Sequence, residues 1–362
     1  EAFTMYRNTK NVPYYVFGRG SLAQLGDLLN PRREAVDGPV VYFVDHFFRD
    51  HELIGRLPME KGDQLHFVDS SSEPEVTRID AFKEAVSAAD SRTPCCVVGI
   101  GGGNALDTAK AVANLLTNPG KAEDYQGWEL VKNPAVYKIG IPTLSGTGSE
   151  CSRTCVLTNI PKNLKLGMNS DYTVYDQLLL DPDLLATVPR DQYFYTGIDT
   201  FMHCVESLQG SYRNAIIDAF SVRAVQLCEE IFLSDDMMSE ENREKMMIAS
   251  YIGGMAAGNV GVIHPFSAGL GVVLHVAHGL GNCLALNVLG DIYPKEYKQF
   301  RTMIERQGVN LPTGICKDLT EEQYEGLYRG CIVHEKPLTN ALGPDFKQIL
   351  TRENLIERYK SI

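Results

Sequence analysis

The sequence has no long hydrophobic run and no excess of positive charge. Its apolar stretches stay well below the ~18 residues that a membrane-spanning helix needs, and the N-terminal segment EAFTMYRNTKNVPYYVFG lacks a signal-peptide core. The formal net charge is −12 at pH 7, whereas nucleic acids and anionic membranes are bound through basic surfaces. We therefore expect a cytoplasmic protein with no nucleic-acid partner and no membrane partner.

The sequence also lacks a cysteine spacing typical of disulfides. It has nine cysteines, an odd number, and they are scattered apart from the adjacent pair Cys95 and Cys96. Most of them have apolar neighbours, which is typical of free thiols in a reducing compartment. This pattern excludes a small disulfide-stabilised fold.

The first half of the chain predicts an α/β domain. Short β-rich runs occupy Pro39–Asp45, Asp63–Asp69 and Cys95–Gly101, and residues 75–91 between the last two have helical periodicity. Apolar strands that alternate with helices indicate a parallel sheet covered by helices. We expect residues 1–185 to form a Rossmann-like dinucleotide-binding domain.

The second half has a different pattern. The segments 196–210, 214–232 and 241–259 are helical in period and almost free of β-branched runs, and Pro182 and Pro189 mark the change. We expect residues 186–362 to form an all-α domain that binds a metal. A cleft between the two domains would be the natural ligand site.

A strand, a glycine turn and a helix follow each other around Gly101, Gly102 and Gly103. Glycines let backbone N–H groups approach an anion closely, and a helix N-terminus adds its positive dipole end. Asn104 is a good N-cap residue, and Asp107 resembles its partner in a capping box. The turn could hold the pyrophosphate of a dinucleotide, or it could be a strand–helix junction without a ligand.

Two features favour the dinucleotide. A second glycine turn occurs at Phe17–Leu22, and Asp45 ends the first predicted strand. A carboxylate at that position can accept hydrogen bonds from a ribose diol and would repel the 2′-phosphate of NADP. We therefore expect NAD.

Histidines are concentrated in one apolar stretch. His264, His275 and His278 lie within GVIHPFSAGLGVVLHVAHGLGN, although the chain has only eight histidines. Upstream, Asp199 and His203 are spaced i, i+4, which places both side chains on one face of a helix. Together they could supply three imidazoles and a carboxylate for Zn²⁺ or Fe²⁺, whereas Ca²⁺ and Mg²⁺ prefer oxygen ligands. The alternative is a surface pair and a set of core histidines.

Several motifs in order resemble the iron-containing (group III) alcohol dehydrogenase family, which shares its fold with glycerol dehydrogenase and dehydroquinate synthase. The segments GGGNALDTAK, IPTLSGTGSE, LLLDPDLL and GIDTFMHCVES are similar to the family's glycine loop, its G-T-G-S-E segment, its DP-x-L element and its D-x-x-x-H-x-x-E ligand helix. The resemblance covers about residues 12 to 290. It implies a dehydroquinate synthase-like fold.

The resemblance also implies roles for individual residues. The implied metal ligands are Asp199, His203, His264 and His278, around zinc or iron. The implied NAD-binding residues are Asp45, Gly101, Gly102, Gly103, Asn104, Asp107, Thr143, Thr147 and Lys165.

The sequence departs from the family in two places. Ala268 stands where the family commonly has a proton-relaying histidine, and His275 could replace it as a catalytic residue or could be a packing residue. Cys151 and Cys155 replace the more usual Val and Ala. The second departure resembles the branch that oxidises the C8 hydroxyl of 3-deoxy-D-manno-octulosonate.

The expected function is metal-dependent oxidation of a primary alcohol to an aldehyde, with hydride transfer to NAD. The sugar-acid branch would feed an aminotransferase in lipopolysaccharide biosynthesis, and it would need a local cation from among Arg153, Lys165 and Arg213. The alternatives are a dehydrogenase of a small alcohol or diol, a dehydroquinate synthase-like lyase, and a nucleotide- or metal-sensing protein. A homodimer and the aminotransferase are the protein partners considered.

Overall fold

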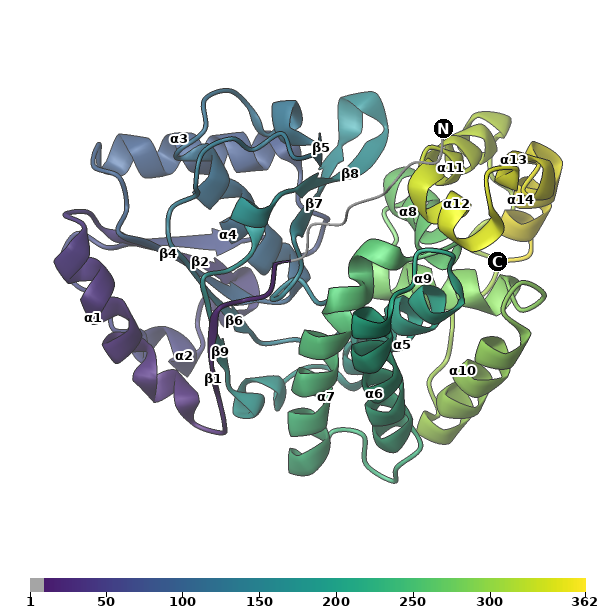
Figure 1. Ribbon diagram of the computed structural model, residues 1–362, viewed down its shortest axis with the longest axis horizontal. Coiled ribbons are helices and arrows are strands. Elements are labelled where there is room, and N and C mark those ends of the chain that lie inside the picture. The colour runs from purple at the N-terminus through teal and green to yellow at the C-terminus, as the bar shows by residue number, and fades with distance from the viewer. Residues whose placement is uncertain (1–9) are drawn as a thin grey trace.

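A six-stranded parallel sheet organises the first half of the chain in the computed structural model, which describes residues 10–362 (Figure 1). The strand order is β1-β9-β6-β4-β2-β3, and every pair is parallel. The strands are β1 Tyr14–Phe17, β2 Val40–Asp45, β3 Gln64–Val68, β4 Cys96–Gly101, β6 Lys138–Pro142 and β9 Gln177–Leu180.

Alternate residues of the central strands point to opposite faces of this sheet, and both faces are covered by helices. On β2, the buried Tyr42 packs with Leu25 and Leu53 from α1 and α2, whereas Phe43 packs with residues of α3 and α4 on the other face. A strand buried on both faces needs a continuous apolar run, which explains the sequence VVYFV. The covering helices are α1 Leu25–Ala35, α2 Glu52–Gly55, α3 Val76–Ala89 and α4 Gly103–Leu115.

A second, three-stranded sheet has the order β5-β8-β7. Strands β7 and β8 are antiparallel, and β5 is parallel to β8. The strands are β5 Gly127–Trp128, β7 Thr154–Asn159 and β8 Leu164–Asn169. This small sheet lies on the side of the α/β part that faces the helical part (Figure 1).

Helices make up the rest of the described chain after β9. The α-helices are α5 Arg190–Gln209, α6 Ala215–Phe232, α7 Glu240–Gly253, α8 Ile263–Leu274, α9 His278–Val288, α10 Pro294–Gln307, α11 Glu321–Ile332, α12 Glu335–Leu342, α13 Phe346–Ile349 and α14 Arg352–Lys360. The short 3-10 helices of the whole chain are η1 Ser21–Gln24, η2 His46–Phe48, η3 Ala122–Tyr125, η4 Ile160–Lys162, η5 Asp171–Thr173, η6 Pro182–Leu185 and η7 Gly254–Asn259.

The expected fold class is confirmed, with a parallel Rossmann-like sheet first and a helical part after it. The three predicted strands are β2, β3 and β4, and the predicted helix 75–91 is α3. The domain boundary at residues 185/186 stays a prediction, because one large core includes both Tyr175 near β9 and Phe194 on α5. The nine cysteines are all buried and free.

No single helix within residues 10–362 is both long and apolar enough to cross a membrane, although one bent pair, 240–259 with 263–274, passes by length and composition alone.

The strand order creates a topological switch point between β2 and β4. The chain leaves β2 towards β3 on one side of the sheet, and it leaves β4 towards β6 on the other side. In open parallel sheets, ligands bind at such a point, beyond the carboxyl ends of the strands. Asp45 ends β2 and Gly101 ends β4, so two of the predicted nucleotide residues border this crevice.

Candidate metal centre and nucleotide site

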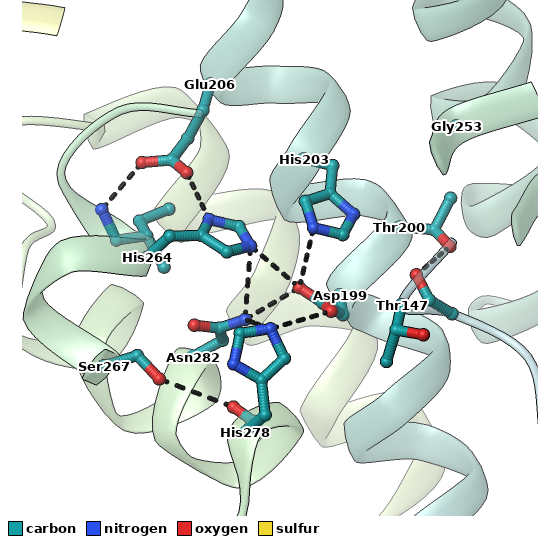
Figure 2. Close-up of polar contacts among 12 residues, drawn as sticks. Thr147, Asp199, Thr200, His203, Glu206, Gly253, His264, Ser267, His278 and Asn282 are labelled. Atoms are coloured by element: carbon teal, nitrogen blue, oxygen red, sulfur yellow. Dashed lines mark hydrogen bonds and ion pairs between the residues drawn. The ribbon is translucent and has the colours of Figure 1, made fainter. Parts of the chain in front are cut away.

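Four predicted metal ligands come together from three helices (Figure 2). Asp199 and His203 lie on α5, His264 lies in the first turn of α8, and His278 begins α9. One potential ligand atom from each residue lies within 4.8 Å of all the others. The resulting group is one carboxylate surrounded by three imidazoles.

Asp199 is fully buried, and its carboxylate lies within 4 Å of all three histidines. Its Oδ1 atom lies 3.1 Å from Nε2 of His264 and 3.7 Å from Nε2 of His203, and its Oδ2 atom lies 3.3 Å from Nε2 of His278. In a tetrahedral site with bonds of about 2.0–2.1 Å, neighbouring ligand atoms lie about 3.3 Å apart. The spacing of this group therefore fits a divalent cation.

Small residues in the histidine-rich stretch explain how the helices approach so closely. A side chain at Gly279 would place its Cβ atom 2.5 Å from the carbonyl oxygen of Tyr195, so α9 packs directly on the backbone of α5. Between α8 and α9 the chain turns at His275, which has a left-handed backbone with φ 55°. The glycines and this turn bring His264 and His278 to the same place.

Hydrogen bonding determines which atom of His264 is available for a metal. The Nδ1 atom of His264 donates to Oε2 of Glu206 at 2.6 Å, so its Nε2 atom is left to face Asp199. Although burial opposes the effect, the two carboxylate partners raise the pKa of the ring, so without a metal the Nε2 atom keeps a proton and donates it to Oδ1 of Asp199 at 3.1 Å. A cation between these two atoms would take the place of that proton, which is a second reason why the residues fit a metal.

The surroundings shift the pKa values of three members of the group. Burial alone would raise the pKa of Asp199, but the nearby histidines outweigh it and hold the pKa well below the usual range. Burial lowers the pKa of His203 to about 3. Burial would also lower the pKa of His264, but its hydrogen bonds to Asp199 and Glu206 raise it to about 9. The carboxylate is therefore ionised at neutral pH and available to a cation.

The chain also places two residues at this centre whose roles were not predicted. The Nδ2 atom of Asn282 donates to Oδ1 of Asp199 at 2.7 Å. Glu206 accepts from the backbone nitrogen of Ile263 at 2.6 Å as well as from His264. Glu206 lies in the segment GIDTFMHCVES, seven residues after Asp199. Because it shares a helix face with His203, its position could have indicated a role at the metal centre. Asn282 had no comparable signal in the sequence.

Replacing Glu206 by Gln is expected to weaken metal binding about 10- to 100-fold, because the glutamine is neutral and holds the His264 ring less firmly. Metal content and affinity, measured by competition with a chelator, test this expectation. Asp235→Asn is a control, because the Asp235 side chain is exposed and pairs with Arg306, which does not belong to the metal group. Unchanged metal affinity in Glu206→Gln would show that Glu206 does not position His264.

The predicted catalytic residue His275 does not join the group. It is exposed at the end of α8, and within residues 10–362 no hydrogen bond or ion pair connects it to Asp199 or to the other histidines. Ala268, at the family's usual relay position, is buried on the same helix. The proton-relay role of His275 stays a prediction.

The glycine turn lies at the switch point and touches several predicted nucleotide residues. A Cβ atom on Gly101 would lie 3.0 Å from Cβ of Asp45, and one on Gly103 would lie 3.0 Å from Oγ1 of Thr147. The backbone nitrogen of Thr143 donates to the carbonyl oxygen of Gly101 at 3.0 Å. Gly101 has φ 153°, a conformation that strongly favours glycine. These contacts gather five of the predicted residues around one turn.

The predicted capping of this helix is wrong. Helix α4 begins at Gly103, Gly102 is the N-cap, and no side chain caps the helix. Asn104 instead donates from its side-chain amide to the carbonyl oxygen of Ser72. Because the glycines allow the helix to begin earlier than expected, its first N–H groups have no side-chain cap, and this is the arrangement that anions use at helix N-termini.

Asp107 is buried in the first half of α4, after the glycine turn. Its carboxylate accepts from the backbone nitrogen of Val156 at 2.9 Å and lies 3.9 Å from Nζ of Lys110. Burial raises the pKa of Asp107, although Lys110 opposes this effect. The residue ties α4 to β7 and thereby supports the loop; its place among the nucleotide-binding residues stays a prediction.

The side chain of Asp45 already has partners of its own. It accepts from the backbone nitrogen of Phe47 at 3.0 Å and from Oγ of Ser70 at 2.9 Å. The backbone N–H groups of the second predicted glycine turn also have partners within the chain. Gly20 and Leu22 donate theirs to the carboxylate of Asp181 at 3.0 Å each. The glycine turn at Gly101 is therefore the stronger candidate for a phosphate site.

Comparison with known proteins shows the family. Residues 13–182 match the model of the iron-containing alcohol dehydrogenases, and residues 193–326 match the C-terminal model of the Fe-containing alcohol dehydrogenase family. The chain therefore belongs to the iron-containing alcohol dehydrogenase family. The branch that acts on 3-deoxy-D-manno-octulosonate stays a prediction.

Individual relatives differ in what they act on. The chain is 34% identical over 220 residues to a sulfoacetaldehyde reductase of Bilophila wadsworthia (strain 3_1_6), covering 59% of this chain and 56% of that protein. It is 29% identical over 278 residues to an NAD-dependent methanol dehydrogenase of Bacillus methanolicus, covering 75% and 71%. The chain thus spans little more than half the length of the first relative.

The fold is that of solved dehydrogenases of this kind. The crystal structure of sulfoacetaldehyde reductase from Bifidobacterium kashiwanohense in complex with NAD+ has a TM-score of 0.79 and 24% identity, and 98% of each chain is covered. The predicted dehydroquinate synthase-like architecture is thereby confirmed for the described residues.

Proposed function

We propose that this protein is an NAD-dependent alcohol dehydrogenase that uses a divalent metal, zinc or iron, to oxidise a primary alcohol to an aldehyde. The observation that carries the proposal is the group of Asp199 and three histidines, whose ligand atoms lie within 4.8 Å of one another. The glycine turn at the switch point supports the nucleotide part of the proposal.

A single loop connects the glycine turn to the helix that carries Asp199 and His203. Thr147 lies against Gly103 of the glycine turn, and the carbonyl oxygen of Gly146 accepts from Oγ1 of Thr200, the residue after Asp199, at 2.8 Å. Figure 2 shows Thr147 and Thr200 beside the metal group. The loop thus holds the proposed nucleotide turn against the ligand helix α5.

A divalent cation at this centre would supply Lewis-acid chemistry, which lowers the pKa of an alcohol, and the nicotinamide ring of NAD would accept the hydride. The chain itself orients His264 through Glu206 and keeps Asp199 away from solvent. His278 is the most open ligand, with 29% of its side chain exposed, so substrate would enter on its side.

The three cations that could bind an acidic substrate bear on the choice of substrate. Each predicted cation already has a carboxylate partner: Lys165 with Glu73 at 3.1 Å, Arg153 with Asp171 at 2.6 Å, and Arg213 with Asp218 at 2.8 Å. An anionic sugar acid would have to compete with these carboxylates. This charge balance favours an uncharged alcohol or diol over 3-deoxy-D-manno-octulosonate, which is the second candidate substrate.

The test is the formation of NADH by metal-loaded and chelator-treated protein. The substrates are 1-propanol, 1,3-propanediol and 3-deoxy-D-manno-octulosonate. We expect metal-dependent NADH with the two uncharged alcohols. NADH with the sugar acid alone would support the sugar-acid branch. If no alcohol yields NADH although metal and NAD are bound, the dehydrogenase proposal fails and a lyase or a sensor remains.

A further inference from the structure

Asn282 reaches into the metal group from α9, one helical turn after His278 (Figure 2). Its Nδ2 atom lies 2.7 Å from Oδ1 of Asp199, 3.4 Å from Nε2 of His264 and 3.2 Å from Nε2 of His278. Around a cation with bonds of about 2.0–2.1 Å, neighbouring ligand atoms lie about 3.0–3.4 Å apart. The two distances to the imidazoles match this spacing, so the end of the amide lies where a further ligand atom would lie.

The oxygen end of the same amide is buried and points away from the group. The Asn282 side chain is fully buried, and within residues 10–362 its Oδ1 atom accepts no hydrogen bond. Figure 2 shows this oxygen on the side opposite to Asp199 and His278. A buried polar atom without a partner carries a free-energy cost. A half-turn about the Cβ–Cγ bond would exchange the two ends of the amide and bring the oxygen to the ligand position.

Charge decides which end of the amide faces the group. Without a cation, the carboxylate of Asp199 carries the negative charge of the centre, and the N–H group of Asn282 donates to it. A bound divalent cation would be the largest charge nearby, and side-chain amide dipoles orient in the local field. The amide oxygen is the negative end of the dipole, and amide oxygens bind divalent cations in other proteins. A cation therefore favours the turned amide.

We propose that Asn282 is a fifth protein ligand, whose amide presents Oδ1 when the metal binds, and that it favours Fe²⁺ over Zn²⁺. The inference rests on the proposed function, because it concerns the metal of that reaction. Three imidazoles and two oxygens leave one position of an octahedron open. Zn²⁺ in proteins is usually satisfied by four ligands, whereas Fe²⁺ centres hold more positions. The fifth ligand therefore stabilises Fe²⁺ more than Zn²⁺.

The visible absorption of the Co²⁺-loaded protein tests the coordination. Co²⁺ absorbs strongly in a tetrahedral four-ligand site, and its bands weaken as the number of ligands rises. We expect weak bands in the wild-type protein and stronger bands in Asn282→Leu, which has a similar size but no ligand atom. Asn287→Leu is the matched control, because Asn287 lies on the same helix and accepts from Arg301 at 3.4 Å. Equal spectra for the wild type and Asn282→Leu would overturn the proposal.

Metal affinity, measured by competition with a chelator and without oxygen for Fe²⁺, gives a second test. Asn282→Leu should weaken Fe²⁺ binding about tenfold or more and Zn²⁺ binding by less than about threefold. Equal weakening for both metals would show that Asn282 acts only as a hydrogen-bond donor to Asp199, and the proposal would be wrong. Asn282→Asp has an oxygen at both ends, so it should bind Fe²⁺ at least as tightly as the wild type. Weaker Fe²⁺ binding by Asn282→Asp would also contradict a ligand at this position.

These measurements need no turnover, so they separate this inference from the proposed function. If the Co²⁺ spectrum responds to Asn282→Leu but no alcohol yields NADH, the ligand role stands and the dehydrogenase proposal fails. If alcohols are oxidised in a metal-dependent way but the spectrum does not respond, only the role of Asn282 is wrong. A wild-type protein that binds neither Co²⁺ nor Fe²⁺ would overturn both. The melting temperature of each metal-free variant shows whether it is folded.

Discussion

Replacing Asp199 by Asn is expected to remove the bound metal and to lower kcat/KM about a thousandfold. Asp199 is the only carboxylate of the proposed ligand set, and it is fully buried among three histidines. Without its charge, the centre would hold a cation by neutral ligands alone. A Lewis acid contributes several kcal/mol of transition-state stabilisation, and about 4 kcal/mol corresponds to a factor of a thousand.

Metal content and NADH formation should be measured together for Asp199→Asn. The metal analysis tests the ligand role even if no substrate has been identified. Asp235→Asn again provides the control, since 96% of the Asp235 side chain is exposed and its partner Arg306 lies on the surface. If Asp199→Asn retains both metal and activity, Asp199 is not a ligand and the proposed centre is wrong.

The second large effect is expected at Gly146, where replacement by Ala should destabilise the protein by about 4 kcal/mol or more. A Cβ atom there would lie 1.6 Å from the carbonyl oxygen of Thr196, and the backbone has φ 146°. The contact is with the backbone of α5, so no flexible side chain can move aside. Strained backbone and a forced shift of packed elements are among the mechanisms that produce effects of this size.

The measurement for Gly146→Ala is the midpoint of unfolding in urea, with metal content as a second readout. Gly146 also donates to Ser250 at 2.8 Å and accepts from Thr200 at 2.8 Å, so the variant should disturb the ligand helix as well. Gly258→Ala is a matched control, because nothing lies within 4 Å of its Cβ position. Equal midpoints for the two variants would contradict this account of the close approach.

Local patterns predicted the strands and helices whose own residues show a β-rich run or a helical period. Strands β2, β3 and β4 are short β-rich runs, and α3 and α5 have clear helical periods, so each could be located from its own residues. Strand β1, with its mostly exposed YYVF, and the small sheet β5-β8-β7 were not predicted. These strands depend on pairing with segments far away in the chain, and such pairing leaves no periodic pattern in the local sequence.

The four candidate metal ligands were predicted, but the residues that hydrogen-bond to them were not. Asp199 and His203 are visible as an i, i+4 pair, and the histidine-rich stretch stands out by composition. The hydrogen bond from Asn282 to Asp199 joins residues 83 positions apart, and the one from His264 to Glu206 joins residues 58 positions apart.

The sequence by itself determined the class of fold and the glycine turn, because these depend on residue type and spacing within short segments. The four candidate metal ligands followed from two local patterns together with the resemblance to the family. The tertiary structure decided the rest. It showed that α4 begins at Gly103 without a side-chain cap and that His275 stays outside the metal group. It also showed that Arg153, Lys165 and Arg213 are already paired with carboxylates. Charge balance and burial arise only when distant segments pack together, and they are what favours an uncharged substrate.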